Sequence, residues 1–295
     1  MINSKKYGVI DVGSNSVRAI LYSDGKILYK GLITSRLGEG LFESGNIKEE
    51  PFKRSIDAIK TLFYNLLTKG ADEIFSFATE AVRSAKNGKD FVFAVREETG
   101  LELDVVSGDE EGELGLLGAL KSSGGGIIDI GGASAEIVGA KNGKIIYSHS
   151  LSLGAVRLYD KCGENENLLE KTISERIDEY GEVPVDIDYY AIGGTATTLG
   201  MLDARLEIYD ENVVDGRIVD YKSVVEIYEN LKNTTITDRI EKLHINPKRA
   251  EIILGGVYLL KRIMEKFDIK RITVSEGDNM LGYLKKRVFG ECYER

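Results

Sequence analysis

The sequence GVIDVGSNSVRAI, residues 8–20, and the sequence GIIDIGGASAEIV, residues 126–138, share an unusual arrangement. Each is an apolar strand that ends in an aspartate and continues into glycine and small polar side chains. Glycine-rich turns of this kind let the backbone approach a ligand closely, and their N–H groups can form an anion-binding nest. Both stretches are therefore candidates for phosphate-binding loops.

The two stretches belong to an internal repeat. Asp129 lies 118 residues after Asp11, and at this offset Asp24-Gly25 aligns with Asn142-Gly143. Asp-Gly and Asn-Gly are strong signals for a β-hairpin turn. Each copy thus predicts a strand, a tight turn, a strand, a hairpin turn and a third strand. Because the repeat is too long for a solenoid, it predicts two related domains that face one another.

Composition limits the classes of protein to which the chain can belong. Its 295 residues are 42% hydrophobic, which is enough for a substantial core. A net charge of −9 argues against a nucleic-acid or anionic-membrane surface, but it allows an anionic substrate in a small pocket. No apolar run approaches the roughly 18 residues of a membrane helix, and no secretory signal is evident. With two cysteines and two histidines, we expect reduced thiols, no zinc site and a cytoplasmic location.

Helix and strand signals alternate along the chain, which favours the α/β class. The predicted helices span 51–68, a stretch ending near 99, 109–120, 155–161, 168–180, 247–267 and 278–288. The further predicted strands span 73–78, 103–106, 188–192 and 271–274. The best linker is SSGGG, residues 122–126, so we place the domain boundary between 1–124 and 125–295. We expect the last helix, at about 278–289, to pack back on the first domain.

Three glycine-rich turns are candidate phosphate sites, at residues 13–16, 131–134 and 193–198. An aspartate that ends a strand, Asp11 or Asp129, can hold a hydrated divalent cation beside the phosphates. Glu111, in the sequence SGDEEG, is either a helix N-terminal acid or a carboxylate that orients or deprotonates water. Arg36 and Arg83 offer bidentate contacts to phosphate, although either could be a surface arginine.

Taken together, these residues resemble the Ppx/GppA family of exopolyphosphatases and guanosine-pentaphosphate phosphatases, which belongs to the actin-like ATPase superfamily. The matching segments are VIDVGSNSVR (9–18), SRLGEGL (35–41), FATEAVRSAKN (77–87), VVSGDEEGELG (105–115), IIDIGGASAEIV (127–138), SLSLGAVRL (150–158), AIGGTATTLG (191–200), NPKRAEIILGGVYLL (246–260) and SEGDNMLGYL (275–284). They occur in family order over nearly the whole chain. The resemblance implies two actin-like (ribonuclease H-like) domains with an interdomain cleft that binds the substrate phosphates.

The resemblance also implies roles for single residues. Glu111 matches the family's catalytic glutamate, and Asp129 and Glu136 look like the residues of a Mg²⁺ site. The expected substrate-binding residues are Asp11, Gly13, Ser14, Asn15, Ser16, Arg36, Arg83, Gly131, Gly132, Ala133, Ser134, Gly193, Gly194 and Thr195. The chain departs from the family pattern at Ala133, Ala135 and Gly112, which leaves the acids intact but bears on substrate preference.

We therefore expect a Mg²⁺-dependent hydrolase that removes a terminal phosphate from inorganic polyphosphate, with short chains favoured because the helical C-terminal domains of longer relatives are missing. Hydrolysis of guanosine pentaphosphate is the alternative. Two alternatives belong to other functional classes of protein. One is a sugar kinase, and the other is a non-catalytic actin-like sensor of nucleotide or phosphate. A homodimer is the family-based expectation for the quaternary structure.

Overall fold

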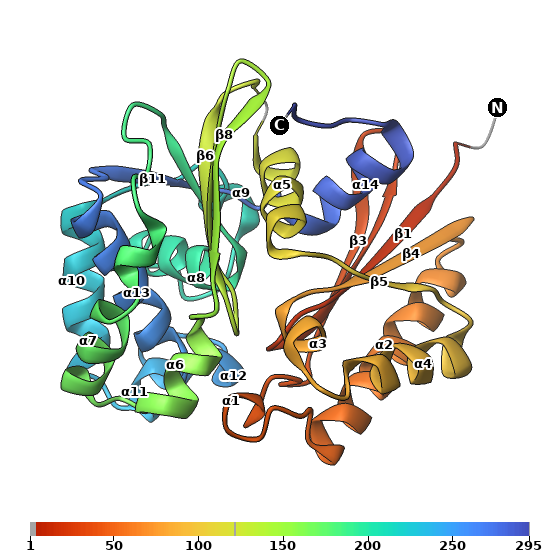
Figure 1. The fold of residues 1–295 in the computed structure, drawn as a ribbon, viewed down its shortest axis with the longest axis horizontal. Coiled ribbons are helices and arrows are strands. Elements are labelled where there is room, and N and C mark those ends of the chain that lie inside the picture. The colour runs from red at the N-terminus through yellow and green to blue at the C-terminus, as the bar shows by residue number, and fades with distance from the viewer. Residues whose placement is uncertain (1–3, 121, 295) are drawn as a thin grey trace.

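The computed structural model describes residues 4–120 and 122–294, and these form two β-sheets with two helices between them (Figure 1). The first sheet has the order β3-β2-β1-β4-β5. Its strands are β1 (Tyr7–Val12), β2 (Ser16–Ser23), β3 (Lys26–Thr34), β4 (Glu73–Ala78) and β5 (Leu103–Val105). The first three pair antiparallel, whereas β4 and β5 run parallel to β1. Helices α1 (Leu41–Ser44), α2 (Glu49–Thr68), α3 (Glu80–Ser84) and α4 (Gly88–Thr99) complete this part, which we call the first lobe.

The second sheet repeats this topology and adds one strand. Its order is β10-β11-β9-β6-β7-β8. The strands are β6 (Gly125–Ile130), β7 (Ala135–Lys141), β8 (Lys144–Leu151), β9 (Tyr189–Ile192), β10 (Ile218–Asp220) and β11 (Arg271–Val274). The second lobe also contains α6 (Ala155–Cys162), α7 (Glu166–Ser174), a 3₁₀ turn (Ile177–Tyr180), α8 (Gly193–Asp203), α9 (Glu211–Val214), α10 (Tyr221–Lys232), α11 (Ile236–Glu241), α12 (Pro247–Ala250) and α13 (Ile253–Lys266). The predicted α/β class, with two sheets of related topology, is confirmed.

The internal repeat extends to fine details of the backbone. Shifting β1 by 118 residues gives the bounds of β6, and both hairpin turns have positive φ, 51° and 77° at Asp24-Gly25 and 55° and 77° at Asn142-Gly143. The strand register slips between Leu21 and Tyr22 in one lobe and between Gly139 and Ala140 in the other, again 118 residues apart. The two predicted three-stranded meanders are therefore confirmed, including a bulge that the sequence pattern did not indicate.

Helices α5 (Gly108–Ala119) and α14 (Asn279–Phe289) lie between the sheets and connect them (Figure 1). Apolar residues of α5, such as Leu116, pack against the second sheet, whereas Met280 and Leu284 of α14 join Val9 and Phe77 in the core of the first sheet. The last helix thus lies against the first sheet, and beyond it Glu294 forms a bridge to Lys144 of the second lobe. The exact boundary at 124/125 stays a prediction.

Four sequence predictions needed correction. The helix predicted for 247–267 is broken between α12 and α13. A tight turn separates them, in which Ile252 N donates a hydrogen bond to Arg249 O at 3.0 Å. The apolar periodicity continues across the break, so the pattern gave no sign of it. Residues 168–180 form α7 and a separate 3₁₀ turn, because the backbone hydrogen bonds tighten after α7: Arg176 N donates to Ile173 O at 3.0 Å and Glu179 N to Arg176 O at 2.9 Å.

The third glycine-rich segment, residues 193–198, is the beginning of α8 and not a turn between strands. It still directs helical N–H groups toward the cleft, which is a favourable arrangement for an anion. The predicted linker 122–126 is also shorter than expected, because Gly125 and Gly126 already belong to β6.

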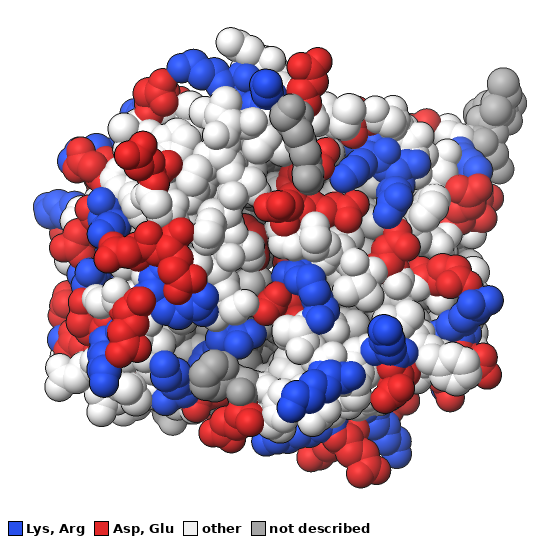
Figure 2. Space-filling view, in the orientation of Figure 1, with Lys and Arg blue, Asp and Glu red and all other residues white. Residues whose placement is uncertain are grey.

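Charges of both signs are interspersed over the surface shown in Figure 2. No broad basic area appears on this face, in keeping with the net charge of −9. None of the described helices is long and apolar enough to cross a membrane.

Gly282→Ala should test the contact between α5 and α14. A Cβ atom at position 282 would lie 1.8 Å from Leu114 O, so the helices would have to move apart. We expect the free energy of unfolding to fall by about 1–3 kcal/mol despite the better helix propensity of alanine. Urea denaturation measures this change.

Gly124→Ala is the matched control, because a Cβ atom there has its nearest neighbour at 3.5 Å. Its unfolding free energy should stay within about 0.5 kcal/mol of the wild type. Equal stability of both variants would show that the helices are not in close contact.

Candidate active site

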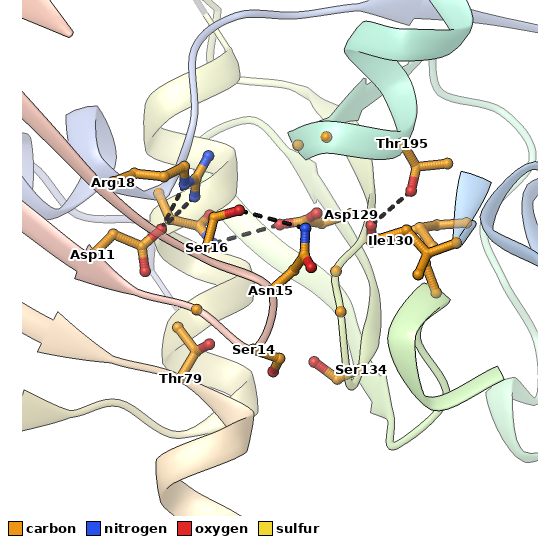
Figure 3. Close-up of a pocket in the computed structure, with 18 of the residues that line it drawn as sticks. Asp11, Ser14, Asn15, Ser16, Arg18, Thr79, Asp129, Ile130, Ser134 and Thr195 are labelled. Carbon is orange, nitrogen blue, oxygen red and sulfur yellow. Dashed lines mark hydrogen bonds and ion pairs between the residues drawn. The ribbon is translucent and has the colours of Figure 1, made fainter. Parts of the chain in front are cut away.

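Strands β1 and β6 end at the same cleft between the lobes, and each presents there the aspartate that precedes its last residue (Figure 3). The cleft contains a cavity of about 110 Å³. Of the predicted site residues, those lining it are Asp11, Gly13, Ser14, Asn15, Ser16, Glu111, Asp129, Gly131, Gly132, Ser134, Gly193, Gly194 and Thr195. Arg36, Arg83, Ala133 and Glu136 do not line it. The structure therefore brings most of the predicted residues together from both lobes.

The two glycine-rich loops have the same geometry and contact each other. Gly13 N donates to Ser16 O at 3.1 Å, and Gly131 N donates to Ser134 O at 3.0 Å. A Cβ atom at Gly132 would lie 2.8 Å from the Ser14 Cβ, so only glycine allows this approach without a shift. The methyl group of Ala133 is buried outside the cavity wall, and this departure from the family pattern leaves the cavity open.

Four of the predicted site residues are carboxylates buried in or beside the cleft. Asp11 is 2% exposed, Asp129 8%, Glu111 7% and Glu136 1%. Asp129 and Glu136 are directly opposite each other in the antiparallel pairing of β6 and β7, which places their side chains on the same face of the sheet. These acids come from three separate stretches of sequence, and strand pairing and helix packing bring them together.

Burial makes the ionised forms of these acids unfavourable. It raises the pKa of Asp129 and the pKa of Glu136, and the Asp129 charge raises the latter further. Burial also raises the pKa of Glu111, as does the nearby Glu136 charge, whereas Arg83 acts in the opposite direction. A cation near these groups would relieve their repulsion.

The donor set fits a magnesium ion. Several buried oxygens have no hydrogen-bond partner among the described residues, namely Asp11 Oδ1, Asn15 Oδ1, Glu136 Oε2 and Asn279 Oδ1. Mg²⁺ prefers oxygen ligands and usually binds through one or two carboxylates together with water and substrate phosphates. The described residues contain no group of three acidic, histidine or cysteine side chains arranged around one point. These oxygens therefore suit an ion that keeps several water ligands. The assignment of Asp129 and Glu136 to this ion stays a prediction.

Two arginines that sequence reasoning did not select line the cavity. Arg18 is paired with Asp11 across the β1–β2 hairpin, forms an ion pair with it, and also contacts Asp278 at 2.6 Å. The tight turn at 13–16 fixes this register, so the pairing could have been derived from the sequence.

Arg249 belongs to α12 and reaches the cavity from the second lobe. It donates to Gly194 O at 2.6 Å and lies near the hydroxyls of Thr197 and Thr198. Burial lowers the pKa of Arg249 to about 10, with a further contribution from the Arg18 charge. A negatively charged ligand would stabilise both cations. No local signal could have placed Arg249 here, because it arrives through the packing of α12.

The predicted arginines Arg36 and Arg83 have partners within the protein. Arg36 contacts Glu251 of the other lobe at 2.8 Å. Arg83 contacts Glu80 at 2.7 Å and Glu111 at 3.3 Å. Their predicted contact with phosphate stays a prediction.

Glu111 occupies the first turn of α5, where the Ser107 side chain caps the helix by accepting from Glu110 N at 3.1 Å. An acid that serves only the helix dipole would ordinarily face solvent, but Glu111 is buried and lines the cavity. Its position is therefore suited to contact with a ligand in the cleft.

These features define a two-lobed α/β protein with an acidic cleft between paired glycine-rich loops. The chain belongs to the Ppx/GppA phosphatase family, whose model matches residues 22–281.

Three comparisons with known proteins are informative. The chain is 28% identical to the bifunctional 3-dehydroquinate synthase/phosphatase of Fusobacterium nucleatum, over 95% of this chain but only 46% of that protein, so it spans about half of this relative. It is also 28% identical to exopolyphosphatase 2 of Mycobacterium tuberculosis, covering 94% of this chain and 97% of that one. The crystal structure of the Ppx/GppA family member of Aquifex aeolicus matches 97% of this chain and 98% of its own, with a TM-score of 0.80 and 27% identity.

Arg18→Met should show how strongly the buried ion pairs stabilise the cleft. The variant leaves Asp11 buried without its guanidinium partner, so we expect a loss of about 3 kcal/mol in unfolding free energy at pH 8. Burial then raises the pKa of Asp11 without opposition, and such a group destabilises the fold as pH rises. The loss should therefore be smaller at pH 5, as measured by urea denaturation without added divalent cations.

Arg287→Met provides the control, since Arg287 is a more exposed arginine that contacts Asp104 at 2.8 Å. The Arg287→Met variant should lower the free energy of unfolding by less than about 1 kcal/mol. A similar cost for both variants, independent of pH, would contradict a special role for the Arg18 pair.

Proposed function

We propose that this protein is a Mg²⁺-dependent phosphoanhydride hydrolase that releases the terminal phosphate from inorganic polyphosphate. The observation that carries the proposal is the meeting of two glycine-rich loops, two arginines and a buried glutamate around one cavity. Phosphoryl transfer requires mainly positioning and neutralisation of charge, and these groups supply both. The similarity to exopolyphosphatase 2 supports polyphosphate as the substrate.

Each set of residues would have a separate role. The N–H groups of the loops at 13–16 and 131–134 would bind the terminal phosphate oxygens. Arg249 would contribute positive charge, since its hydrogen bonds among the described residues go to carbonyl and hydroxyl oxygens. Mg²⁺, held by Asp129 and Glu136 with water, would offset the negative charge of the phosphates when bound.

Glu111 would serve as the general base. It would orient the attacking water and accept its proton, which requires the carboxylate to be ionised. Arg83, at 3.3 Å from Glu111, favours that ionised form against the effect of burial. A sensor without catalytic activity would have no use for a buried carboxylate held in this way.

Short polyphosphates are the better substrates on physical grounds. The cavity of about 110 Å³ has room for few phosphate groups. The face shown in Figure 2 has interspersed charges, so it offers no continuous basic path for a long polyanion.

Guanosine pentaphosphate is the second candidate substrate, because a larger cavity of about 520 Å³ adjoins the first. The two cavities share Arg18, Gly193, Gly194 and Arg249. Apolar side chains line much of the larger one, namely Ile20, Ile27, Leu32, Met201, Ile245 and Met280. Such a lining suits a nucleoside better than a continuing phosphate chain, and the volume lies in the range of small-molecule sites.

A phosphate-release assay tests the proposal directly. The substrates are tripolyphosphate, longer polyphosphates, guanosine pentaphosphate and ATP, each with and without Mg²⁺. We expect Mg²⁺-dependent release, fastest from the short polyphosphates. Formation of a phosphorylated sugar would instead support a kinase, and binding of these compounds without any release would support a sensor.

Glu111→Gln should reduce the chemical step by about two to four orders of magnitude, because the amide cannot accept the proton. Substrate affinity should stay the same or rise slightly in the variant, since the lost carboxylate repels phosphate in the ground state. Single-turnover kinetics with tripolyphosphate measure the step, and equilibrium binding measures the affinity.

Glu110→Gln is the control for the loss of charge in the same helical turn, since Glu110 lies near Lys286 and does not line the cavity. It should retain wild-type turnover. If the Glu111→Gln variant had normal turnover and a slightly lower melting temperature, Glu111 would act only as an acid that stabilises the helix N-terminus.

Leu32→Trp should separate the two candidate substrates. Leu32 and Leu28 are both exposed on β3, but only Leu32 lines the larger cavity. A tryptophan at position 32 would occupy that cavity and lower kcat/KM for guanosine pentaphosphate by about tenfold, with little effect on tripolyphosphate. Leu28→Trp should change neither value. Equal losses on both substrates would argue against a nucleoside site in this cavity.

A further inference from the structure

Glu80 is a buried carboxylate at the start of α3 that contacts both lobes through different oxygens. It is 7% exposed and does not line the cavity. Its Oε2 accepts from Arg83 of its own lobe, at 2.7 Å from Nη2 and 3.2 Å from Nε. Its Oε1 accepts from the second lobe, at 3.0 Å from Ser152 Oγ and 3.4 Å from Arg157 Nη2. Glu80 therefore joins the lobes directly beside the cleft.

On the side of the first lobe, these contacts continue to Glu111. Arg83 Nη1 lies 3.3 Å from Glu111 Oε2 and also donates to Val106 O. A guanidinium is planar and rigid, so fixing its Nη2 and Nε also fixes the direction of Nη1. The orientation of Arg83 toward Glu111 is thus set by Glu80 together with the carbonyl of Val106.

On the side of the second lobe, the contacts continue to a glycine-rich loop. Arg157 Nε donates to Ala133 O at 2.9 Å, and Ala133 belongs to the loop that follows β6. Ser152 follows the end of β8, the third strand of the same meander. The hydrogen bonds that Glu80 Oε1 accepts therefore depend on the position of the second lobe's glycine-rich loop, residues 131–134.

We propose that Glu80 is a positioning residue that couples the approach of the second lobe's loop to the orientation of Glu111 through Arg83. The inference rests on the proposed role of Glu111 as the base. When the lobes are apart, Glu80 lacks Ser152 and Arg157 as partners, and its carboxylate is free to turn away from the geometry that directs Arg83. Closure around a substrate then restores the direction of Arg83 and with it the position of Glu111.

Glu80→Gln tests this coupling. Glutamine has one acceptor oxygen, so its amino group must face a donor-only guanidinium on one side, either Arg83 or Arg157. We expect kcat for tripolyphosphate to fall about ten- to hundredfold, because a small misplacement of the base has an effect of that size. KM should change less than about threefold, since the loops that would bind phosphate keep their residues.

Asp160→Asn is the matched control. Asp160 is another carboxylate between the lobes, accepts from Gly40 N at 3.1 Å, and does not line the cavity. The variant loses the same charge at the same interface but has no contact with Arg83 or Glu111. Its kcat should stay at the wild-type value, and an equal fall in both variants would overturn the proposal by showing a general weakening of the interface.

A double-mutant cycle distinguishes positioning from an independent effect. In a Glu111→Gln background, Glu80→Gln should lower kcat less than about twofold, because there is no base left to orient. The same ten- to hundredfold loss in both backgrounds would overturn the proposal. If Glu80→Gln does not fold, Ser152→Ala, which removes only one contact to Oε1, takes its place in the cycle with a smaller expected loss.

A crystal structure of Glu80→Gln gives a result that does not depend on activity. Arg83 should have moved away from Glu111, and an unchanged Arg83–Glu111 contact would overturn the coupling even if kcat falls. If Glu111→Gln proves fully active, the proposed function of Glu111 fails, and the crystal structure still decides whether Glu80 positions Arg83.

Discussion

The close contact between α5 and α14 is the constraint on which the cleft depends. Each helix packs against a different sheet, and a carbonyl of α5 lies where the Cβ of any residue larger than Gly282 would be. This contact limits how closely the two sheets can approach each other where the helices meet. The residues just before and at the start of α14 also enter the cleft, where Asp278 contacts Arg18 and Asn279 contacts Asp129.

The charges around the cleft follow from that packing. Carboxylates from both lobes are enclosed where water is scarce, and burial alone disfavours their ionised forms. The first lobe supplies Arg18 against this effect, and Arg83 approaches Glu111 from outside the cavity. Glu136 and Asn279 each keep a buried oxygen without a hydrogen-bond partner among the described residues, so the compensation that these residues provide is incomplete. An incompletely compensated acidic site is a suitable place for a divalent cation and a phosphorylated ligand.

Local signals in the sequence were sufficient for much of the fold. The Asp-Gly and Asn-Gly turns and the repeated apolar strands predicted both meanders, because hairpin turns and strand alternation are properties of neighbouring residues. The break before Ile253 and the start of α8 at Gly193 were missed, since apolar periodicity does not show where a backbone changes direction. In the cleft, loop residues were predictable from their small size and spacing. The arrival of Arg249 depends on how distant elements pack, which no local pattern encodes. The engagement of Arg83 with Glu80, by contrast, is a local i,i+3 pair within α3 that the sequence spacing could have suggested.

The pairing across the two hairpins has a consequence for the symmetry of the molecule. Asp11 is opposite Arg18 in the first lobe, and Asp129 is opposite Glu136 in the second. Position 136 is position 18 shifted by the repeat offset of 118, so equivalent sites in the two halves have opposite charge. In one half the aspartate thereby has a cation on the facing strand, whereas in the other half the aspartate faces a second acid and depends on more distant arginines. A backbone with near-twofold pseudosymmetry thus produces an electrically polar cleft, with a facing ion pair in one half and two facing acids in the other.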